Sequence, residues 1–170
     1  MHRVILVSLS TMLLVGLAAC GRSKNEINPR HADRILILKS SHTLSLMRGN
    51  RTLQTYKVAL GRDPVGPKTL RGDHKTPEGE YVVDSLKANS RFYRALHISY
   101  PNEADRERAR NNGQDPGGDV EIHGIENGLG WIGGLHRTVD WTDGCIALTD
   151  PEMQQIWTSV GVGSPVEIRP

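Results

Sequence analysis

Residues 140–150 of this chain read Asp-Trp-Thr-Asp-Gly-Cys-Ile-Ala-Leu-Thr-Asp (DWTDGCIALTD), and they contain one of its two cysteines. Cys145 directly follows Gly144 in a turn, which can expose the sulfur and leave backbone N–H groups free to stabilise an oxyanion. Asp150 and Pro151 are typical of a helix start, with Asp at the N-cap and Pro at the first helical position. Four roles are open to the thiol: nucleophile, metal ligand, redox group or small buried apolar residue.

The first residues indicate export from the cytoplasm. Residues 4–19 are almost uniformly apolar and end in small residues before Cys20. A membrane helix needs about 20 apolar residues, and this shorter run is interrupted by Ser8, Ser10 and Thr11. We therefore interpret residues 1–19 as a signal peptide that is removed.

The rest of the chain is long enough for one domain with its own core. Residues 20–33 are polar and predict a tether, so we place a single domain at 34–170. The exported part loses only Arg3 from the 21 basic residues, so 20 basic residues face 19 acidic ones. Without a basic block, this balance gives no support for nucleic-acid binding.

The apolar pattern along the domain favours short strands. Segments with alternating or β-branched residues are 35–38, 43–47, 52–60, 80–84, 95–99 and 119–123, with 165–168 as an edge strand. Capping signals predict helices at 102–113 and 150–160. Long Gly-rich loops lie at 61–79 and 124–144. We expect a mainly β (α+β) sheet or barrel with two small helices.

His123 is the first candidate partner for the thiol. It ends a predicted strand and precedes Gly124, which would let a substrate approach the imidazole closely. A Cys–His pair supplies a nucleophile and a proton shuttle near neutral pH, which acyl transfer requires. Spacing alone does not single this pair out among seven histidines.

The sequence around both residues resembles a known family. A His-Gly pair, a Gly-rich interval and then Gly-Cys-Ile-x-Leu before a capped helix resemble the catalytic motif of the YkuD-type L,D-transpeptidases. The segment Thr76–Gly79 (TPEG) looks like the TPxG segment of that family. Four further runs look like its YafK-type branch: Asn89–Phe92, Leu96–Pro101, Asp115–Gly118 and Asp140–Cys145.

The resemblance implies a β-sandwich or barrel catalytic domain in which Cys145 is the nucleophile and His123 the general base. It implies that the Gly124 carbonyl orients the imidazole and that Gly144 and Cys145 supply oxyanion donors. It also implies peptidoglycan stem peptides with diaminopimelate as substrates, a thioester intermediate, and no cofactor or metal. The acyl acceptor is an amine in a transpeptidase and water in a hydrolase or amidase, and the YafK-type branch includes an enzyme that detaches an anchored lipoprotein.

The end of the signal peptide also resembles a known motif. Leu17-Ala-Ala-Cys20 resembles a bacterial lipobox, which implies a lipid on Cys20 and a periplasmic location. Gly21 after that cysteine is compatible with sorting to the outer membrane. An ordinary secretory signal with an incidental cysteine is the alternative.

The motif departs from the family at two positions near the nucleophile. Most members have histidine two residues before the cysteine and often arginine two after it, and here these positions are Asp143 and Ala147. An ionised Asp143 would raise the pKa of the thiol unless a cation offsets it. We expect His136 or Arg137 to do so.

Other side chains have both plain and functional readings. Trp141, His97 and Arg91 could line the cleft, or could be a packing tryptophan, a strand histidine and a solvated arginine. A zinc set of His123, His136, Asp143 and Cys145 lacks compact ligand spacing. A decayed site marked by Asp143 would make the protein a non-catalytic peptidoglycan-binding lipoprotein.

Overall fold

The computed structural model describes residues 31–170, so the predicted signal peptide, Cys20 and tether residues up to 30 lie outside the described residues. The described chain is already packed at Ala32, which is buried and donates its N–H to the Ser159 carbonyl at 3.0 Å.

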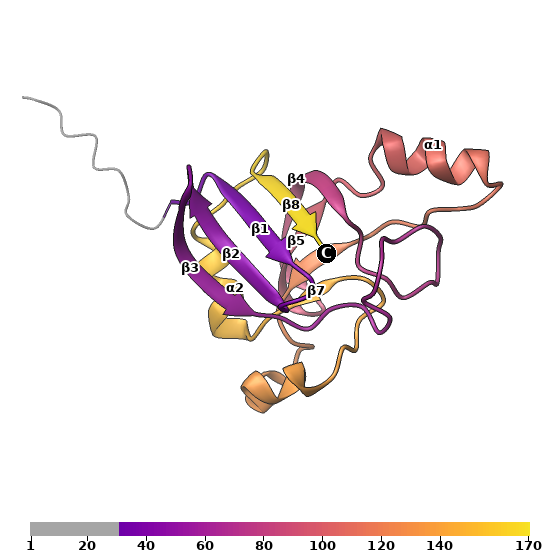
Figure 1. Cartoon of the computed structure of the whole chain (residues 1–170). Coiled ribbons are helices and arrows are strands. Elements are labelled where there is room, and N and C mark those ends of the chain that lie inside the picture. Colours follow the sequence, from indigo (N-terminus) through magenta and orange to yellow (C-terminus); the bar gives the residue numbers. More distant parts are fainter. Residues whose placement is uncertain (1–30) are drawn as a thin grey trace, which may run out of the picture.

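The domain is built on one mixed sheet of eight strands (Figure 1). The strands are β1 (Arg34–Leu38), β2 (Thr43–Arg48), β3 (Arg51–Lys57), β4 (Gly79–Ser90), β5 (Tyr93–Ile98), β6 (Glu121–His123), β7 (Ile146–Ala147) and β8 (Pro165–Arg169). Their order is β3-β2-β1-β8-β4-β5-β6-β7. The β1–β8 and β6–β7 pairs are parallel, and the others are antiparallel.

The chain that continues β3 brings the two ends of this order together. Ala59 and Ala147 exchange backbone hydrogen bonds of 3.0 and 2.9 Å, and Gly61 forms a bridge with Thr142. The sheet is therefore curled, and the turn before Cys145 is fixed to the loop that follows β3.

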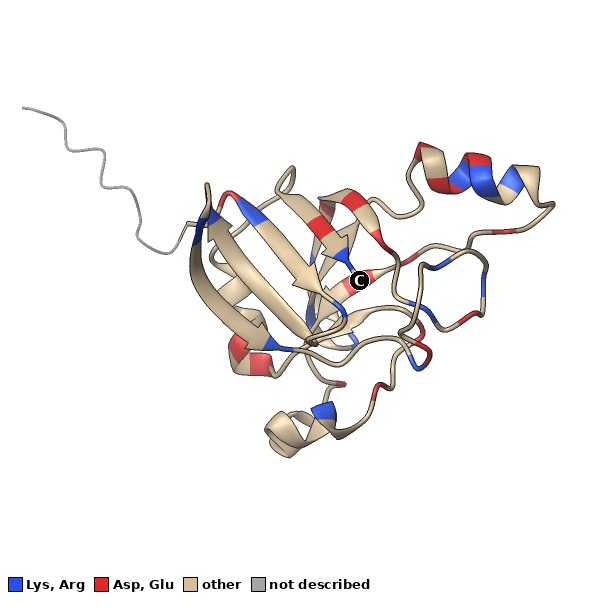
Figure 2. Ribbon diagram, viewed as in Figure 1, with Lys and Arg blue, Asp and Glu red and all other residues tan. Residues whose placement is uncertain are grey.

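Three short helices accompany the sheet: α1 (Glu103–Asn111), the 3₁₀ segment η1 (Gly130–Thr138) and α2 (Asp150–Trp157). Helix α2 packs on the sheet through Met153 and Ile156, which are fully buried. Helix α1 projects from the body, and Figure 2 shows acidic and basic residues mixed along it. No helix among the described residues is long and apolar enough to cross a membrane.

The structure corrects several boundaries. The segment 165–168 is not an edge strand, because β8 pairs with β1 on one side and with β4 on the other. Strand β4 extends to Ser90, well beyond the predicted end at residue 84. The loop 124–144 contains η1, a third helical element. Helix α2 has Thr149 rather than Asp150 as its N-cap, and Glu152 closes a capping box with it.

Candidate active site

The register between β6 and β7 places Cys145 and His123 on one face of the sheet. Ile122 pairs with Ile146, and both side chains are fully buried in the core. Side chains alternate between faces along a strand, so His123 after Ile122 and Cys145 before Ile146 both point away from that core. Two adjacent parallel strands thus bring together residues that are far apart in the sequence.

The thiol of Cys145 is half-buried and lies against the start of β6. The Glu121 N–H donates to its Sγ at 3.4 Å, and the Sγ lies 3.7 Å from the Asp119 carbonyl oxygen. Burial, with smaller contributions from Glu121, Asp143 and Asp119, raises the pKa of Cys145 to about 11. The Cys145 side chain is therefore a neutral thiol near pH 7, and it would need a base to act as a nucleophile.

The His123 ring is buried, and a backbone carbonyl holds one of its nitrogens. Its side chain is 2% exposed, and its Nδ1 lies 2.6 Å from the Gly124 carbonyl oxygen. A carbonyl can only accept, so Nδ1 carries the proton and Nε2 is the basic nitrogen. Burial lowers the pKa of His123, although the bond to Gly124 opposes this. The ring is therefore neutral and ready to take a proton.

An aromatic wall encloses the imidazole. The ring centroids of Phe92 and Trp141 lie 4.5 and 5.7 Å from that of His123. The Trp141 Nε1 donates to His136 Nδ1 at 3.4 Å, and burial lowers the pKa of His136 to about 4. These contacts exclude water from one side of His123.

The charge of Asp143 is offset, but not by the residues expected. Arg62 forms an ion pair with Asp143, and His74 Nδ1 lies 2.8 Å from its carboxylate. The hydrogen bond from Arg62, followed by that from His74, holds the pKa of Asp143 below its usual range. The expectation for His136 and Arg137 is wrong, because His136 is buried and Arg137 forms an ion pair with Glu152.

A buried lysine holds the loop that contains Arg62 and His74 in place through hydrogen bonds. Lys39 Nζ donates to the carbonyls of Gly66 and Thr76 at 2.6 and 2.9 Å and to Glu78 Oε1 at 2.8 Å. This loop lies directly against the turn Thr142–Cys145, the cysteine turn. A Cβ at Gly144 would approach the Lys75 carbonyl oxygen to 2.6 Å.

The two expected oxyanion donors differ in their present hydrogen bonds. The Gly144 N–H donates to the Thr142 hydroxyl at 3.1 Å, and that hydroxyl donates to the Cys145 carbonyl at 2.7 Å. The Gly144 N–H is therefore engaged within the turn and would have to leave the Thr142 hydroxyl to meet an oxyanion. The Cys145 N–H has no hydrogen-bond partner in the described part of the chain, which leaves it free to donate to a bound group.

Of the other predicted cleft residues, His97 lies on the same sheet face as the thiol, because its neighbours Leu96 and Ile98 are buried in the core. His97 pairs in register with Glu121, and its Nδ1 and Nε2 lie 2.5 Å from Asp84 Oδ1 and 3.8 Å from Asp119 Oδ1. Arg91 forms an exposed ion pair with Glu126.

The sequence does not indicate two basic residues that pair with acidic residues around Cys145. Arg62 pairs with Asp143, and the Nζ of Lys87 lies 2.5 Å from Glu121 Oε1. A single basic residue in a loop or in a strand forms no sequence pattern that would predict such a contact. The described residues hold no group of three or more His, Cys, Asp or Glu side chains placed to bind a metal ion.

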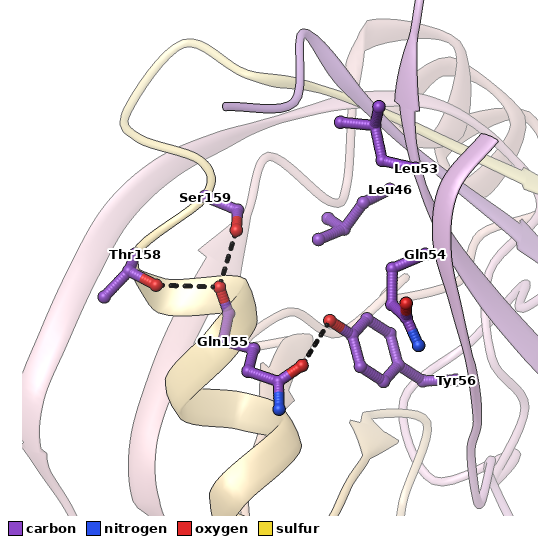
Figure 3. Close-up of a pocket in the computed structure, with 7 residues that line it drawn as sticks. All are labelled: Leu46, Leu53, Gln54, Tyr56, Gln155, Thr158 and Ser159. Atoms are coloured by element: carbon purple, nitrogen blue, oxygen red, sulfur yellow. Dashed lines mark hydrogen bonds between the residues drawn. The ribbon is translucent and has the colours of Figure 1, made fainter. Parts of the chain in front are cut away.

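A separate cavity lies between the C-terminal end of α2 and strands β2 and β3 (Figure 3). It has a volume of about 320 Å³ and is lined by Leu46, Leu53, Gln54, Tyr56, Gln155, Thr158 and Ser159. The Tyr56 hydroxyl donates to Gln155 Oε1 at 3.0 Å across it. It shares no residue with the Cys145 site.

The chain is similar to known proteins over most of its described length. A family model described as the L,D-transpeptidase catalytic domain (YkuD) matches residues 32–168. YafK of Escherichia coli (strain K12) is 32% identical over 132 residues, which make up 74% of this chain and 46% of YafK. The chain thus spans about half the length of the curated relatives it matches.

Solved structures show the same architecture. The helical cell shape determining protein Pgp2 from Campylobacter jejuni is 25% identical, with a TM-score of 0.61 over 79% of this chain and 46% of Pgp2. Bd1075 of Bdellovibrio bacteriovorus is 22% identical, with a TM-score of 0.57 over 82% of this chain and 48% of Bd1075. The predicted mainly β fold class is confirmed. The chain belongs to the L,D-transpeptidase catalytic domain (YkuD) family.

Proposed function

We propose that this protein is a cysteine L,D-transpeptidase that acts on diaminopimelate-containing stem peptides of peptidoglycan. The observation that carries the proposal is the His123 ring, whose Nδ1 is held by the Gly124 carbonyl and which shares a sheet face with Cys145. A neutral thiol on the same sheet face as a neutral, oriented imidazole is suited to general-base acyl transfer. No cofactor enters the scheme.

The geometry supports a two-step reaction. His123 Nε2 takes the Cys145 proton as the sulfur attacks the carbonyl at the L-centre of diaminopimelate, and the Cys145 N–H donates to the resulting oxyanion. The imidazolium then protonates the departing amine, and the C–N bond breaks to leave a thioester. An acceptor amine attacks the thioester and gives its proton to His123, and the thiolate leaves and is reprotonated.

Hydrolysis of the thioester is the second candidate, with water in place of the acceptor amine. It is favoured by the open side of the site, where the side chains of Asp119 and Asp143 are 92% and 73% exposed. The substrate could then be a stem peptide or an anchored lipoprotein. A non-catalytic binding lipoprotein is the third candidate.

Exposure to a carbapenem separates an enzyme from a binding module, because this class of drug acylates the family's cysteine. Intact mass spectrometry should show one adduct on the wild type and none on Cys145→Ser. We expect His123→Gln to slow acylation by about 10²–10⁴-fold, the usual loss when a general base is removed. An unmodified wild-type chain would favour the binding module.

Muropeptide analysis then distinguishes the two enzymes. Cells that express the wild type should contain 3-3 crosslinks that cells with Cys145→Ser lack. If the wild type instead increases protein-free stems without new crosslinks, the enzyme is a hydrolase.

The proposal includes export and a lipid on Cys20, supported by the LAAC segment. A protein anchored in this way, in the outer membrane, should fractionate with membranes, and Cys20→Ser should move it to the soluble periplasmic fraction. A Cys20→Ser variant that stays with the membranes would contradict the lipid anchor.

A further inference from the structure

A carboxylate lies behind the imidazole of His123, separated from it by a single peptide group. The Ile125 N–H donates to Asp150 Oδ1 at 2.8 Å. The Gly124 carbonyl, at the other end of that same peptide group, accepts the Nδ1–H of His123 at 2.6 Å. Asp150, a peptide group and the imidazole therefore form one continuous hydrogen-bonded chain.

The backbone around Asp150 leaves room for the carboxylate alone. A Cβ at Gly124 would lie 2.7 Å from Asp150 Oδ1, and a Cβ at Gly130 would lie 2.4 Å from Oδ2. Neither glycine has a positive φ, so space rather than backbone conformation accounts for both. A larger residue at either position would therefore displace the carboxylate.

Asp150 is not needed as the cap of its own helix. The N-cap of α2 is Thr149, whose N–H and hydroxyl donate to Glu152 Oε2 at 3.1 and 2.6 Å. Glu152 is also the partner of Arg137. The first turn of α2 therefore holds two acidic residues with different tasks, one for the helix and one for the Gly124–Ile125 peptide group.

A negative charge at the N–H end of a peptide group increases the electron density on its carbonyl oxygen, and hydrogen bonds in a chain strengthen one another. A carbonyl polarised in this way is a better acceptor for Nδ1–H, most of all when the ring is cationic. Without that help a buried imidazolium is costly.

We propose that Asp150 is a positioning residue that acts through the Gly124–Ile125 peptide group to orient His123 and to stabilise its protonated form during catalysis. The proposal rests on the proposed function, because it gives His123 the role of general base. It assigns the third group of the site to a carboxylate that no family motif identified.

The test measures the rate of Cys145 alkylation by iodoacetamide from pH 4 to 9, which needs no peptidoglycan. Near neutral pH the reactive form is a thiolate beside a protonated His123, so its population follows the stability of the imidazolium. Asp150→Asn keeps an acceptor for Ile125 N–H but loses the charge. We expect its neutral-pH rate to fall by about 3–10-fold and its acid limb to move to lower pH. The neutral-pH alkylation rate of Asp150→Ala should fall further, because this variant also loses the acceptor for Ile125 N–H.

Glu152→Gln is the matched control, because it removes a charge from the same helical turn and weakens the cap without touching the peptide group. Its melting temperature should fall, while its alkylation profile stays that of the wild type. The proposal is overturned if Asp150→Asn keeps the wild-type profile, or if Glu152→Gln changes it as much. A shifted profile in a protein that forms no crosslinks and cleaves no stems would support Asp150 and reject the proposed function.

Discussion

At the scale of single residues, burial favours the neutral forms of His123 and Cys145, the two groups to which the proposed function gives the chemistry. It lowers the pKa of His123 from 6.5 and raises that of Cys145 to about 11. Acylation requires the unprotonated ring, so its rate should fall only when pH drops through the lowered pKa of His123. We predict that the acid half-point of carbapenem acylation lies below pH 6.5 and that the rate is flat across neutrality. A half-point above 6.5 would mean that His123 is not the group that titrates.

Charges at the rim should tune the thiol more weakly. Arg62→Ala leaves Asp143 with less compensation, so its carboxylate should raise the pKa of Cys145 further and slow neutral-pH alkylation by about 2–5-fold. Asp143→Asn should speed it by a similar factor. Both side chains are more than half exposed, so the effects should shrink in 1 M salt, where the Debye length is about 3 Å. Equal rates for both variants at low salt would contradict this reading.

The sequence predicted the difficulty at Asp143 but not its solution. His136 and Arg137 lie close to Asp143 along the chain but do not pair with it. Arg62 lies 81 positions away and His74 lies 69 positions away, and the loop after β3 brings both to the rim. A contact of this kind depends on how the chain folds over the turn, so no local pattern could indicate it.

At the scale of elements, signals between residues close in the sequence predict the helices better than the strands. The capping box of α1 joins Asn102 and Asp105, and the predicted helix there is confirmed because caps involve residues three apart. Helix α2 is also present, although its N-cap is one residue earlier than predicted. The length and neighbours of a strand depend on pairing with strands far away in the sequence. Local patterns therefore do not indicate that β4 continues to Ser90 or that β8 lies between β1 and β4.

At the same scale, the loop at 61–79 is held by Lys39 and contacts the cysteine turn. This contact can be tested at Gly144. Its φ is +124°, and an added Cβ would meet the Lys75 carbonyl oxygen at 2.6 Å. Gly144→Ala should therefore combine backbone strain with a clash against rigid backbone, and cost about 3–5 kcal/mol. Acylation should fall sharply, because Cys145 is the next residue.

Gly163→Ala isolates the strain component. Gly163 has φ +89° with open space around it, so alanine there should cost only about 1–2 kcal/mol. Urea unfolding of the two variants gives both numbers. If they were equally destabilised, the contact with Lys75 would be unimportant and the loop would not be fixed at this point.

At the scale of the whole molecule, β8 joins the two halves of the sheet. It lies between β1 and β4, so the meander β1–β3 and the site-bearing strands β4–β7 are connected through it. The positions of His123 and Cys145 are fixed on one side of this strand, while the loop that carries Arg62 leaves from the other. The last strand of the sequence therefore supports a site made by residues that precede it.

Truncation after Ser164 should consequently abolish the folded state. It would remove Val166 and Ile168, which are 1% and 2% exposed, and would leave the facing edges of β1 and β4 unpaired. Burial of two such side chains contributes about 3–6 kcal/mol, a large part of the stability of about 5–15 kcal/mol typical of a domain. Circular dichroism should show no cooperative melting for this chain, whereas removal of the exposed Pro170 alone should leave the transition intact. A chain ending at Ser164 that melted cooperatively near the wild-type temperature would show that the two halves of the sheet hold together without β8.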